Sequence, residues 1–213
     1  MSTAPTAPAR GRHELEVFAD VVCPFTHVGL RRLVEWRQRT GQDLGLRVRA
    51  WPLEVVNGEP LDRDFVAEEV EALRSQVAPN LFAGFRTDSF PHTSRPALTL
   101  AAAAYRSSPR TGELVSLELR DLLFEQGEDI SQDEVLAEVA ARHHLSVTEA
   151  DAATIDADLD EGRRRGVIGS PHFFTPTGGW FCPTLTIGRD DSGVLHIDTD
   201  AERFDEFVAS CVA

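Results

Sequence analysis

The stretch that most constrains the fold is a short strand that runs into a cysteine at the start of a helix. Polar and apolar residues alternate over residues 14–17, which is the period of a strand. Apolar residues then recur at helical spacing over residues 30–36, and Gly41 provides a stop. Pro24 suits the first helical position, where no N–H group is needed. The sequence therefore predicts Cys23 at a helix N-terminus.

A cysteine in this position is a candidate nucleophile. The unpaired N–H groups and the positive end of the helix dipole favour a thiolate, and can lower a cysteine pKa from about 8.5 to roughly 3.5–7.5. Thr26 can donate its hydroxyl to the sulfur, and His27 can add positive charge when protonated. Pro24 and Phe25 complete the expected thiolate environment. The alternative is that Cys23 is a small buried residue without reactivity.

Strand signals return after the helix. Residues 46–50 alternate in polarity and are followed by Trp51 and Pro52. A strand, a helix and a strand within fifty residues indicate a right-handed βαβ unit with a parallel pair. From residue 62 to residue 165 the strand period is absent and helical spacing predicts about five helices. Within this block, Ser131 and Ser146 each fit the start of a capping box.

The last part of the chain again reads as strands. Residues 177–179 predict a hairpin turn after Gly166, between strands at residues 172–175 and 181–187. A final helix places Cys211 on its apolar face, which favours a core position. A helical block between two strand-forming segments, with no long linker, predicts an insertion rather than a separate domain.

Composition limits the partners and the location. The net charge of −14 argues against nucleic acid or an anionic membrane as a partner. Residues 1–12 lack an apolar core, so we expect a disordered tail rather than a secretion signal, and a cytoplasmic protein. The three cysteines show no pairing spacing, which favours a redox role for one thiol over a structural disulfide. The paired His143 and His144 lack a third ligand, so no metal site is predicted.

Two segments far apart in the chain resemble the DsbA-like branch of the thioredoxin superfamily. Residues 20–26, Asp-Val-Val-Cys-Pro-Phe-Thr, are similar to its active-site turn, and residues 166–174 are similar to its cis-proline loop. The relatives that the motifs suggest are FrnE-type oxidoreductases, 2-hydroxychromene-2-carboxylate isomerases and kappa-class glutathione transferases. The resemblance implies an α/β fold: a thioredoxin-like mixed sheet, formed by residues 13–61 and 166–213, with a large all-helical insertion at residues 62–165.

The resemblance also implies roles for individual residues. Pro171 should follow a cis peptide bond, so that the Ser170 N–H and C=O face the cysteine and pair with an extended thiol substrate. His172, directly after this proline, is a further candidate for substrate binding. Asp20 would lie at the base of the turn, where it could accept the thiol proton or shift its pKa. The alternative for Asp20 is an acid that accepts hydrogen bonds from nearby backbone N–H groups.

The chain departs from the family pattern at one position. Dithiol members carry a second cysteine where this chain has Thr26, so a mixed disulfide on Cys23 lacks the adjacent resolving thiol. The isomerases and kappa transferases carry serine in place of Cys23 itself. Cys182 could resolve the disulfide instead, if its Cα lies within about 4.4–6.8 Å of the Cys23 Cα.

Three functions fit these residues. The first is a cytosolic monothiol oxidoreductase acting on mixed disulfides or protein disulfides through Cys23 and Thr26. The second is a transferase or isomerase that depends on a small thiol, glutathione or mycothiol, the latter because a chain without lysine indicates a GC-rich genome. The third is a redox-silent thioredoxin-fold binding module. No tightly bound cofactor is expected, and the oligomeric state, monomer or homodimer, stays open.

Overall fold

The computed structural model describes residues 13–212, so the tail predicted for residues 1–12 lies outside the described residues. The helices and strands follow one another along the chain as β1 (His13–Ala19), α1 (Pro24–Thr40), β2 (Leu44–Ala50), α2 (Leu53–Asn57), α3 (Arg63–Gln76), the 3-10 helix η1 (Thr87–Ser89), α4 (Arg95–Ser107), α5 (Pro109–Gln126), α6 (Asp133–Arg142), α7 (Glu149–Arg164), β3 (His172–Thr175), β4 (Gly178–Phe181), β5 (Thr186–Arg189), β6 (Leu195–Asp198) and α8 (Ala201–Cys211).

The centre of the molecule is a mixed sheet with the strand order β2-β1-β3-β4. Strand β1 pairs with β2 in parallel and with β3 antiparallel, and β3 pairs antiparallel with β4. The parallel β1–α1–β2 unit confirms the βαβ prediction, and the sheet is thioredoxin-like. Strands β5 and β6 form a second, two-stranded antiparallel sheet.

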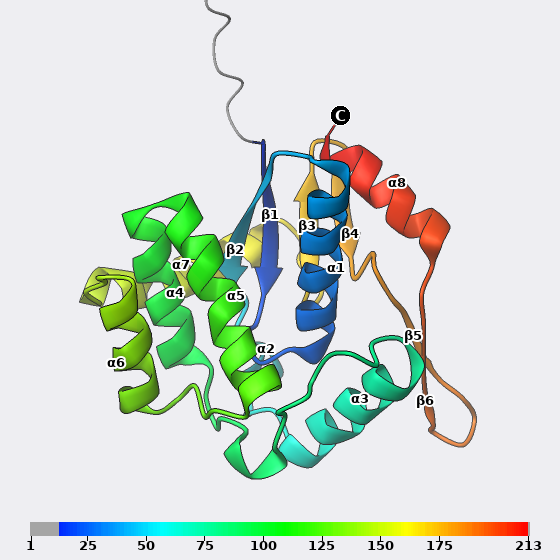
Figure 1. The fold of residues 1–213 in the computed structure, drawn as a ribbon, viewed down its shortest axis with the longest axis horizontal. Coiled ribbons are helices and arrows are strands. Elements are labelled where there is room, and N and C mark those ends of the chain that lie inside the picture. The colour runs from blue at the N-terminus through cyan, green and yellow to red at the C-terminus, as the bar shows by residue number, and fades with distance from the viewer. Residues whose placement is uncertain (1–12, 213) are drawn as a thin grey trace, which may run out of the picture.

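The helical insertion lies between β2 and β3 in the chain. Helices α3 to α7 correspond to the five helices predicted there, whereas the short α2 was not predicted. Helices α4, α5 and α7 contact β2, so they cover that edge of the sheet. Figure 1 shows them grouped beside β2, with α8 beside β4 and α3 below the start of α1. The insertion therefore covers the β2 edge of the sheet, and its helix α3 lies next to α1, below the start of α1 where the Cys23 turn lies.

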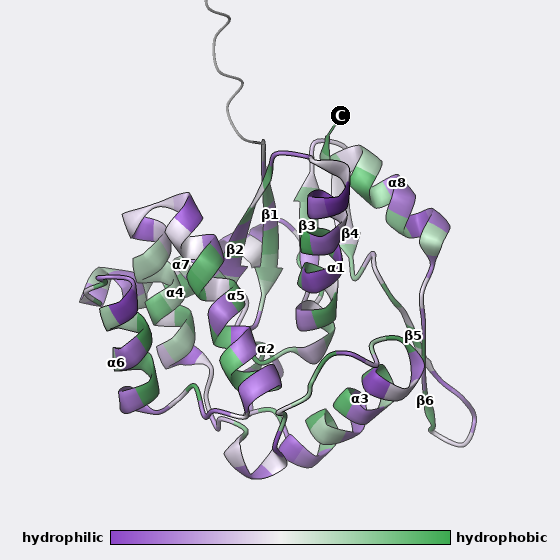
Figure 2. Cartoon of the chain, in the orientation of Figure 1, coloured by the Kyte–Doolittle hydropathy of each residue, from purple (hydrophilic) through white to green (hydrophobic). Residues whose placement is uncertain are grey.

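Strand β1 is buried on both faces. Leu15 and Val17 belong to a hydrophobic cluster with residues of α1 and α8, whereas Phe18 packs against Trp51 and Leu159 on the opposite face. Figure 2 shows the hydrophobic colour along β1 and hydrophilic colour on the outer turns of α1 and α8. This position between two helical layers makes β1 a rigid base for the turn that follows it.

The predicted hairpin is present, but its second strand was misplaced. Strand β4 begins at Gly178, and residues 186–189 pair with β6 instead of continuing β4. Gly179 lies in the strand, where an added Cβ would lie 2.8 Å from the His172 ring. This glycine allows close approach between strands and does not form the turn, which explains the error. The chain then leaves β4 at Cys182, whose φ is 44°.

We expect the substitution Phe207→Ala to lower the free energy of unfolding by about 3–5 kcal/mol, the usual cost of a large cavity in a core. Phe207 is fully buried on α8, and its ring lies 5.0 Å from the ring of Phe173 and 5.8 Å from that of Trp180. The control is Phe65→Ala, since Phe65 on α3 is 45% exposed. Urea unfolding measures both variants; equal losses would contradict this packing.

Candidate active site

The Cys23 turn and the cis-proline loop meet in the fold. The peptide bond between Ser170 and Pro171 is cis, and the Cys23 thiol donates a hydrogen bond to the Ser170 carbonyl oxygen at 3.2 Å. The two predictions that matter most for the site, a cis bond and contact between these segments, are therefore confirmed. Cys23 is the N-cap residue of α1, and Pro24 is buried in the first turn, as predicted.

The Ser170 hydroxyl joins the same two segments a second time. It accepts a hydrogen bond from the Asp20 N–H at 2.9 Å and lies 2.9 Å from the Thr26 hydroxyl. Three residues of the β1–α1 turn are thus fixed to one residue of the loop. This geometry places a thiol and two hydroxyls within one small site.

Cys23 is only 3% exposed, and this burial dominates its electrostatics. Desolvation raises the pKa of the thiol above its ordinary value, although hydrogen bonds from Thr26 and Ser170 act in the opposite direction by favouring the thiolate. Negative charge on Glu69 raises the pKa further. The predicted lowering of the pKa is therefore wrong for the free protein. The loss of hydration around the thiolate outweighs the stabilisation by the hydrogen bonds from Thr26 and Ser170.

Asp20 is fully buried beneath the turn. Its carboxylate accepts hydrogen bonds from the Leu53 N–H at 2.6 Å, the Ser94 hydroxyl at 3.1 Å and the Val22 N–H at 3.3 Å. Burial raises the pKa of Asp20 to about 6 in spite of these donors. Its hydrogen bonds match the alternative interpretation, an acid that accepts from nearby backbone N–H groups.

His27 does not supply charge to the sulfur. Its Nε2 atom lies 2.7 Å from Glu125, and its ring packs against the rings of Phe82 and Phe124. Burial lowers the pKa of His27, which disfavours the protonated form. The same Glu125 accepts hydrogen bonds from the N–H groups of Phe82 and Ala83. His27 therefore attaches α1 to α5 and to the segment before η1, and its predicted electrostatic role is wrong.

Sequence comparison decides the family. The model of the DSBA-like thioredoxin domain matches residues 14–191, which is most of the chain. The protein belongs to the DSBA-like thioredoxin family. No curated protein matches the sequence significantly.

Solved structures share the fold at low sequence identity. A 2-hydroxychromene-2-carboxylate isomerase structure matches with a TM-score of 0.60 at 15% identity, over 79% of this chain and 88% of the other. The cytosolic disulfide reductase DsbM from Pseudomonas aeruginosa matches with a TM-score of 0.58 at 19% identity, over 92% and 95%. DsbM has also been solved with GSH. ScsC from Proteus mirabilis matches with a TM-score of 0.52 at 13% identity, over 94% and 83%.

The remaining predicted residues surround the site of this DSBA-like protein without contacting the sulfur through a hydrogen bond. Phe25 is half-buried against the larger hydrophobic cluster. His172 accepts a hydrogen bond from the Ile168 N–H at 3.3 Å, and its ring stacks on that of Phe174 at 4.9 Å. His172 therefore braces the cis-proline loop from behind. Its role in substrate binding stays a prediction.

Cys182 lies against the cis-proline loop. Its N–H donates to the Pro171 carbonyl at 3.0 Å, next to the Ser170 carbonyl that accepts from Cys23. Burial, followed by the negative charge of a Cys23 thiolate, raises the pKa of Cys182 to about 12. Both cysteines are free thiols in the structure. Whether Cys182 resolves a disulfide on Cys23 stays a prediction.

Sequence reasoning missed three polar residues around the site. Glu69 on α3 is half-buried, and burial raises its pKa to about 7. Arg120 on α5 is 1% exposed and donates to the Asp20 carbonyl at 3.1 Å, and Ser94 donates to the Asp20 carboxylate. Only Glu69 left a signal, since it falls between Val66 and Val70 on the apolar face of a predicted helix.

Two further features concern the described residues as a whole. Within residues 13–212, no group of three or more His, Cys, Asp and Glu side chains is placed to hold a metal ion. No helix in the same part of the chain is long and apolar enough to cross a bilayer.

We expect the alkylation rate of Cys23 to rise with pH and to keep rising above about pH 9, because its pKa is raised and the thiolate is the reactive form. Iodoacetamide labelling in a Cys182→Ala, Cys211→Ala background measures this profile. Thr26→Val should slow labelling roughly fivefold at pH 8, since loss of one hydrogen bond costs about 1 kcal/mol. Thr26→Ser keeps the hydroxyl and is the control; identical profiles for Thr26→Val and its parent would contradict the hydrogen bond.

Asp20 should make the free energy of unfolding depend on pH. Its pKa is about 6 in the folded state and 3.8 ordinarily, so the folded state holds the proton more tightly. Stability from this group is present below pH 4 and is lost as the pH rises to about 6, on the order of 2–3 kcal/mol. Asp20→Asn should therefore flatten the pH dependence between pH 4 and 6, leaving the part due to Glu69. Urea unfolding across this range measures it, and Asp205→Asn controls for net charge. An unchanged slope in Asp20→Asn would contradict the raised pKa.

Proposed function

We propose that this DSBA-like protein is a thiol–disulfide oxidoreductase that works through the single nucleophile Cys23. The observation that carries the proposal is the 3.2 Å hydrogen bond from the Cys23 thiol to the Ser170 carbonyl, at the loop with the cis bond before Pro171. Thr26 occupies the position where dithiol members have their second cysteine. A thiol in this position can attack a disulfide, but it has no adjacent second cysteine to resolve the mixed disulfide that forms.

The proposed chemistry balances without a metal or a second active-site cysteine. The Cys23 thiolate attacks one sulfur of a substrate disulfide RS–SR′, so that a Cys23–SR mixed disulfide forms and R′S⁻ leaves and takes a proton. A second thiol, R″SH, then attacks the R sulfur as its thiolate. This step forms RS–SR″ and regenerates the Cys23 thiol. The substrate disulfide is reduced in the first step, and R″SH is oxidised in the second.

The surroundings of Cys23 support both steps. The donors of Thr26 and Ser170 favour the thiolate as attacking and as leaving group. The Ser170 carbonyl now accepts from the thiol, and in a substrate complex it is free to accept from the main chain of an extended peptide once the sulfur has reacted. Substrate binding by Ser170 and Pro171, with His172 bracing them, follows from this arrangement.

We propose a low-molecular-weight thiol as the resolving agent, glutathione or mycothiol. The raised pKa of Cys182 supports this choice over internal resolution, because a thiol with a pKa of about 12 is almost wholly protonated at neutral pH. The structure of DsbM with GSH is consistent with a small thiol at such a fold. A cytoplasmic location and the choice between monomer and homodimer remain parts of the proposal.

A second candidate function is a redox-silent binding module. The observation in its favour is the burial of Cys23 together with its raised pKa, since both reduce reactivity toward substrates. The transferase or isomerase alternative has the fold shared with 2-hydroxychromene-2-carboxylate isomerase as its support. The thiol experiment below separates the oxidoreductase from both of these alternatives.

The test follows turnover of a mixed disulfide between glutathione and a cysteine-containing peptide, with excess glutathione or mycothiol as the second thiol. We expect wild type to release the peptide thiol catalytically and Cys23→Ser to fall to the uncatalysed rate. Cys211→Ala, which removes a core thiol on α8, should retain activity and is the matched control. No turnover by wild type would overturn the proposal in favour of a binding module or an isomerase. Loss of turnover in Cys182→Ala would replace the single-cysteine mechanism by a two-cysteine one.

A further inference from the structure

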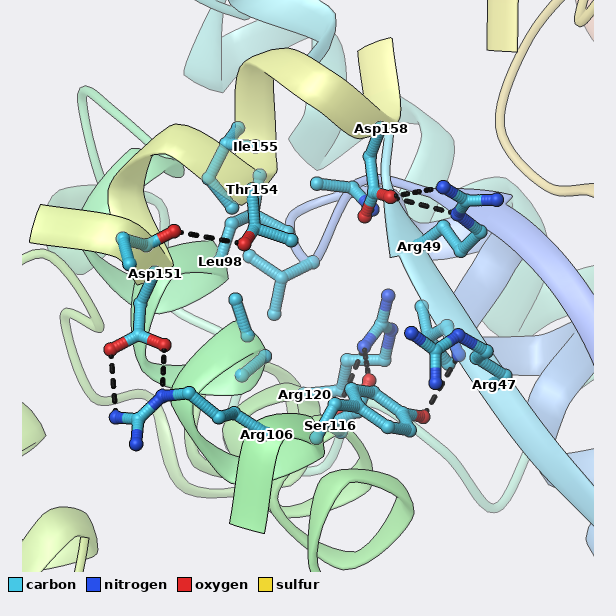
Figure 3. Close-up of a pocket in the computed structure, with 17 residues that line it drawn as sticks. Arg47, Arg49, Leu98, Arg106, Ser116, Arg120, Asp151, Thr154, Ile155 and Asp158 are labelled. Carbon is cyan, nitrogen blue, oxygen red and sulfur yellow. Dashed lines mark hydrogen bonds and ion pairs between the residues drawn. The ribbon is translucent and has the colours of Figure 1, made fainter. Parts of the chain in front are cut away.

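A cavity of about 220 Å³ lies at the β2 edge of the sheet, between β2 and helices α4, α5 and α7. Figure 3 shows its lining, with Arg49 from β2 and Asp158 from α7 turned toward each other, and with Arg47 from β2 and Arg120 from α5 below them in the view. The cavity is partly open to solvent. Cys23 is not part of its lining, so the cavity is separate from the thiol site.

Two of the four arginines that line the cavity are neutralised by its two carboxylates. Arg49 bonds the Asp158 carboxylate at 2.7 Å. Arg106 donates two hydrogen bonds to the Asp151 carboxylate, at 2.7 and 3.0 Å. The acidic groups of the lining are therefore already paired, and they leave two cationic groups without a carboxylate partner in the cavity.

Arg120 is the first of these two cations. It is 1% exposed, and its terminal nitrogens donate to Ser116 and to the Asp20 carbonyl. Its Nε–H is buried and has no hydrogen-bond partner among the described residues. Burial lowers the pKa of Arg120 to about 10, so the guanidinium stays charged at neutral pH. A buried donor of this kind costs free energy unless an acceptor reaches it.

Arg47 is the second. Its guanidinium lies over the ring of Tyr105, 5.6 Å from the ring centroid, and this contact holds it at the cavity. Among residues 13–212, no protein group forms a hydrogen bond or an ion pair with this guanidinium. Tyr105 is itself fixed, because its hydroxyl accepts from the Val48 N–H at 2.8 Å and donates to the Leu46 carbonyl at 3.0 Å. The second cation is thus held in place but unpaired.

The rest of the wall combines apolar side chains with the hydroxyl groups of Tyr105, Ser116 and Thr154. Its apolar part includes Leu98, Ala101 and Ala102 of α4 and Ile155 of α7. A cavity of this volume has room for a small organic molecule. Two guanidinium groups without a carboxylate partner, beside apolar side chains, are suited to bind an organic carboxylate. The guanidinium geometry matches the carboxylate, and the apolar side chains can contact the hydrocarbon part.

We propose that this cavity binds a small organic carboxylate, with its carboxylate between Arg47 and Arg120 and its apolar part against α4 and Ile155. The site goes beyond the proposed redox function and does not depend on it, because Cys23, Thr26 and Ser170 do not line the cavity. Arg120 borders both sites, since it also donates to the Asp20 carbonyl beneath the Cys23 turn. The ligand satisfies the Nε–H of Arg120 and the free guanidinium of Arg47 in one step.

The experiment is isothermal titration calorimetry of the full chain with benzoate, and with benzamide as a neutral compound of the same shape. We expect saturable benzoate binding and at least roughly tenfold weaker benzamide binding, a difference of about 1.4 kcal/mol. Arg47→Met should weaken benzoate roughly tenfold. Arg110→Met, which removes one exposed positive charge from α5 outside the cavity lining, should leave the affinity unchanged. Cys23→Ser should bind benzoate as wild type does, whatever its effect on mixed-disulfide turnover.

Four calorimetric outcomes with wild type, Arg47→Met and Arg110→Met would overturn the proposal. These are no saturable benzoate binding by wild type, equal binding of benzamide, an Arg47→Met variant that binds as wild type, and an equal loss in Arg110→Met. Loss of benzoate binding in Cys23→Ser would place the ligand at the thiol site and would also reject the cavity. Because Arg120 is buried and its removal can unfold the protein, the contact between Arg120 and the ligand is tested in wild type. An NMR titration follows the Nε–H resonance of Arg120. That resonance should shift with saturation by benzoate; a fixed resonance rejects the contact.

Discussion

Ser170 holds the candidate site together. Its hydroxyl and its carbonyl contact three residues of the β1–α1 turn, Asp20, Cys23 and Thr26, which are about 150 residues away in the chain. The position of Ser170 depends in turn on the pairing of β3 with β1, which begins two residues later. The helical insertion is therefore accommodated without loss of the contact, because the strands that flank it, β2 and β3, belong to the same central sheet.

Burial sets the chemistry of the site more than charge does. Desolvation raises the pKa of the Cys23 thiol, of Asp20 to about 6 and of Glu69 to about 7. Three acids are thus shifted toward their neutral forms, and Arg120 is the cation that opposes this for Asp20. In the oxidoreductase that we propose, such a site would receive a neutral disulfide without the cost of burying additional charge.

Local signals account for the parts that the sequence predicted well. Pro24 after Cys23 fixes the start of α1, and strand periodicity fixes β1 and β2. The turn between β1 and α1 could therefore be predicted from the sequence. The capping box that begins α7 shows the limit of this approach. It forms between Thr148 and Asp151, two residues after the predicted Ser146, because Asp151 is held by Arg106 from another helix. Sequence spacing alone cannot reveal that partner.

The properties of the site that could not be predicted all depend on distant segments. The acidity of Cys23 follows from its depth in the fold, and no pattern around residue 23 reports depth. His27 has the spacing of a residue that could assist the sulfur, but its partner Glu125 lies 98 residues further along the chain. The sequence around Gly179 predicts a turn, because the crowding of Gly179 against His172 exists only once β3 and β4 have paired.

The depth of Cys23 also determines what its reaction rate means. A reagent reaches a sulfur that is 3% exposed only in conformations in which neighbouring segments have separated. When such opening is rapid and reversible, the observed rate is the rate of the exposed thiolate multiplied by the population of open molecules. Mild denaturant would then accelerate modification without any change in the acidity of the sulfur. Slow labelling of Cys23 thus measures how firmly its surroundings close over it, in addition to how good a nucleophile it is.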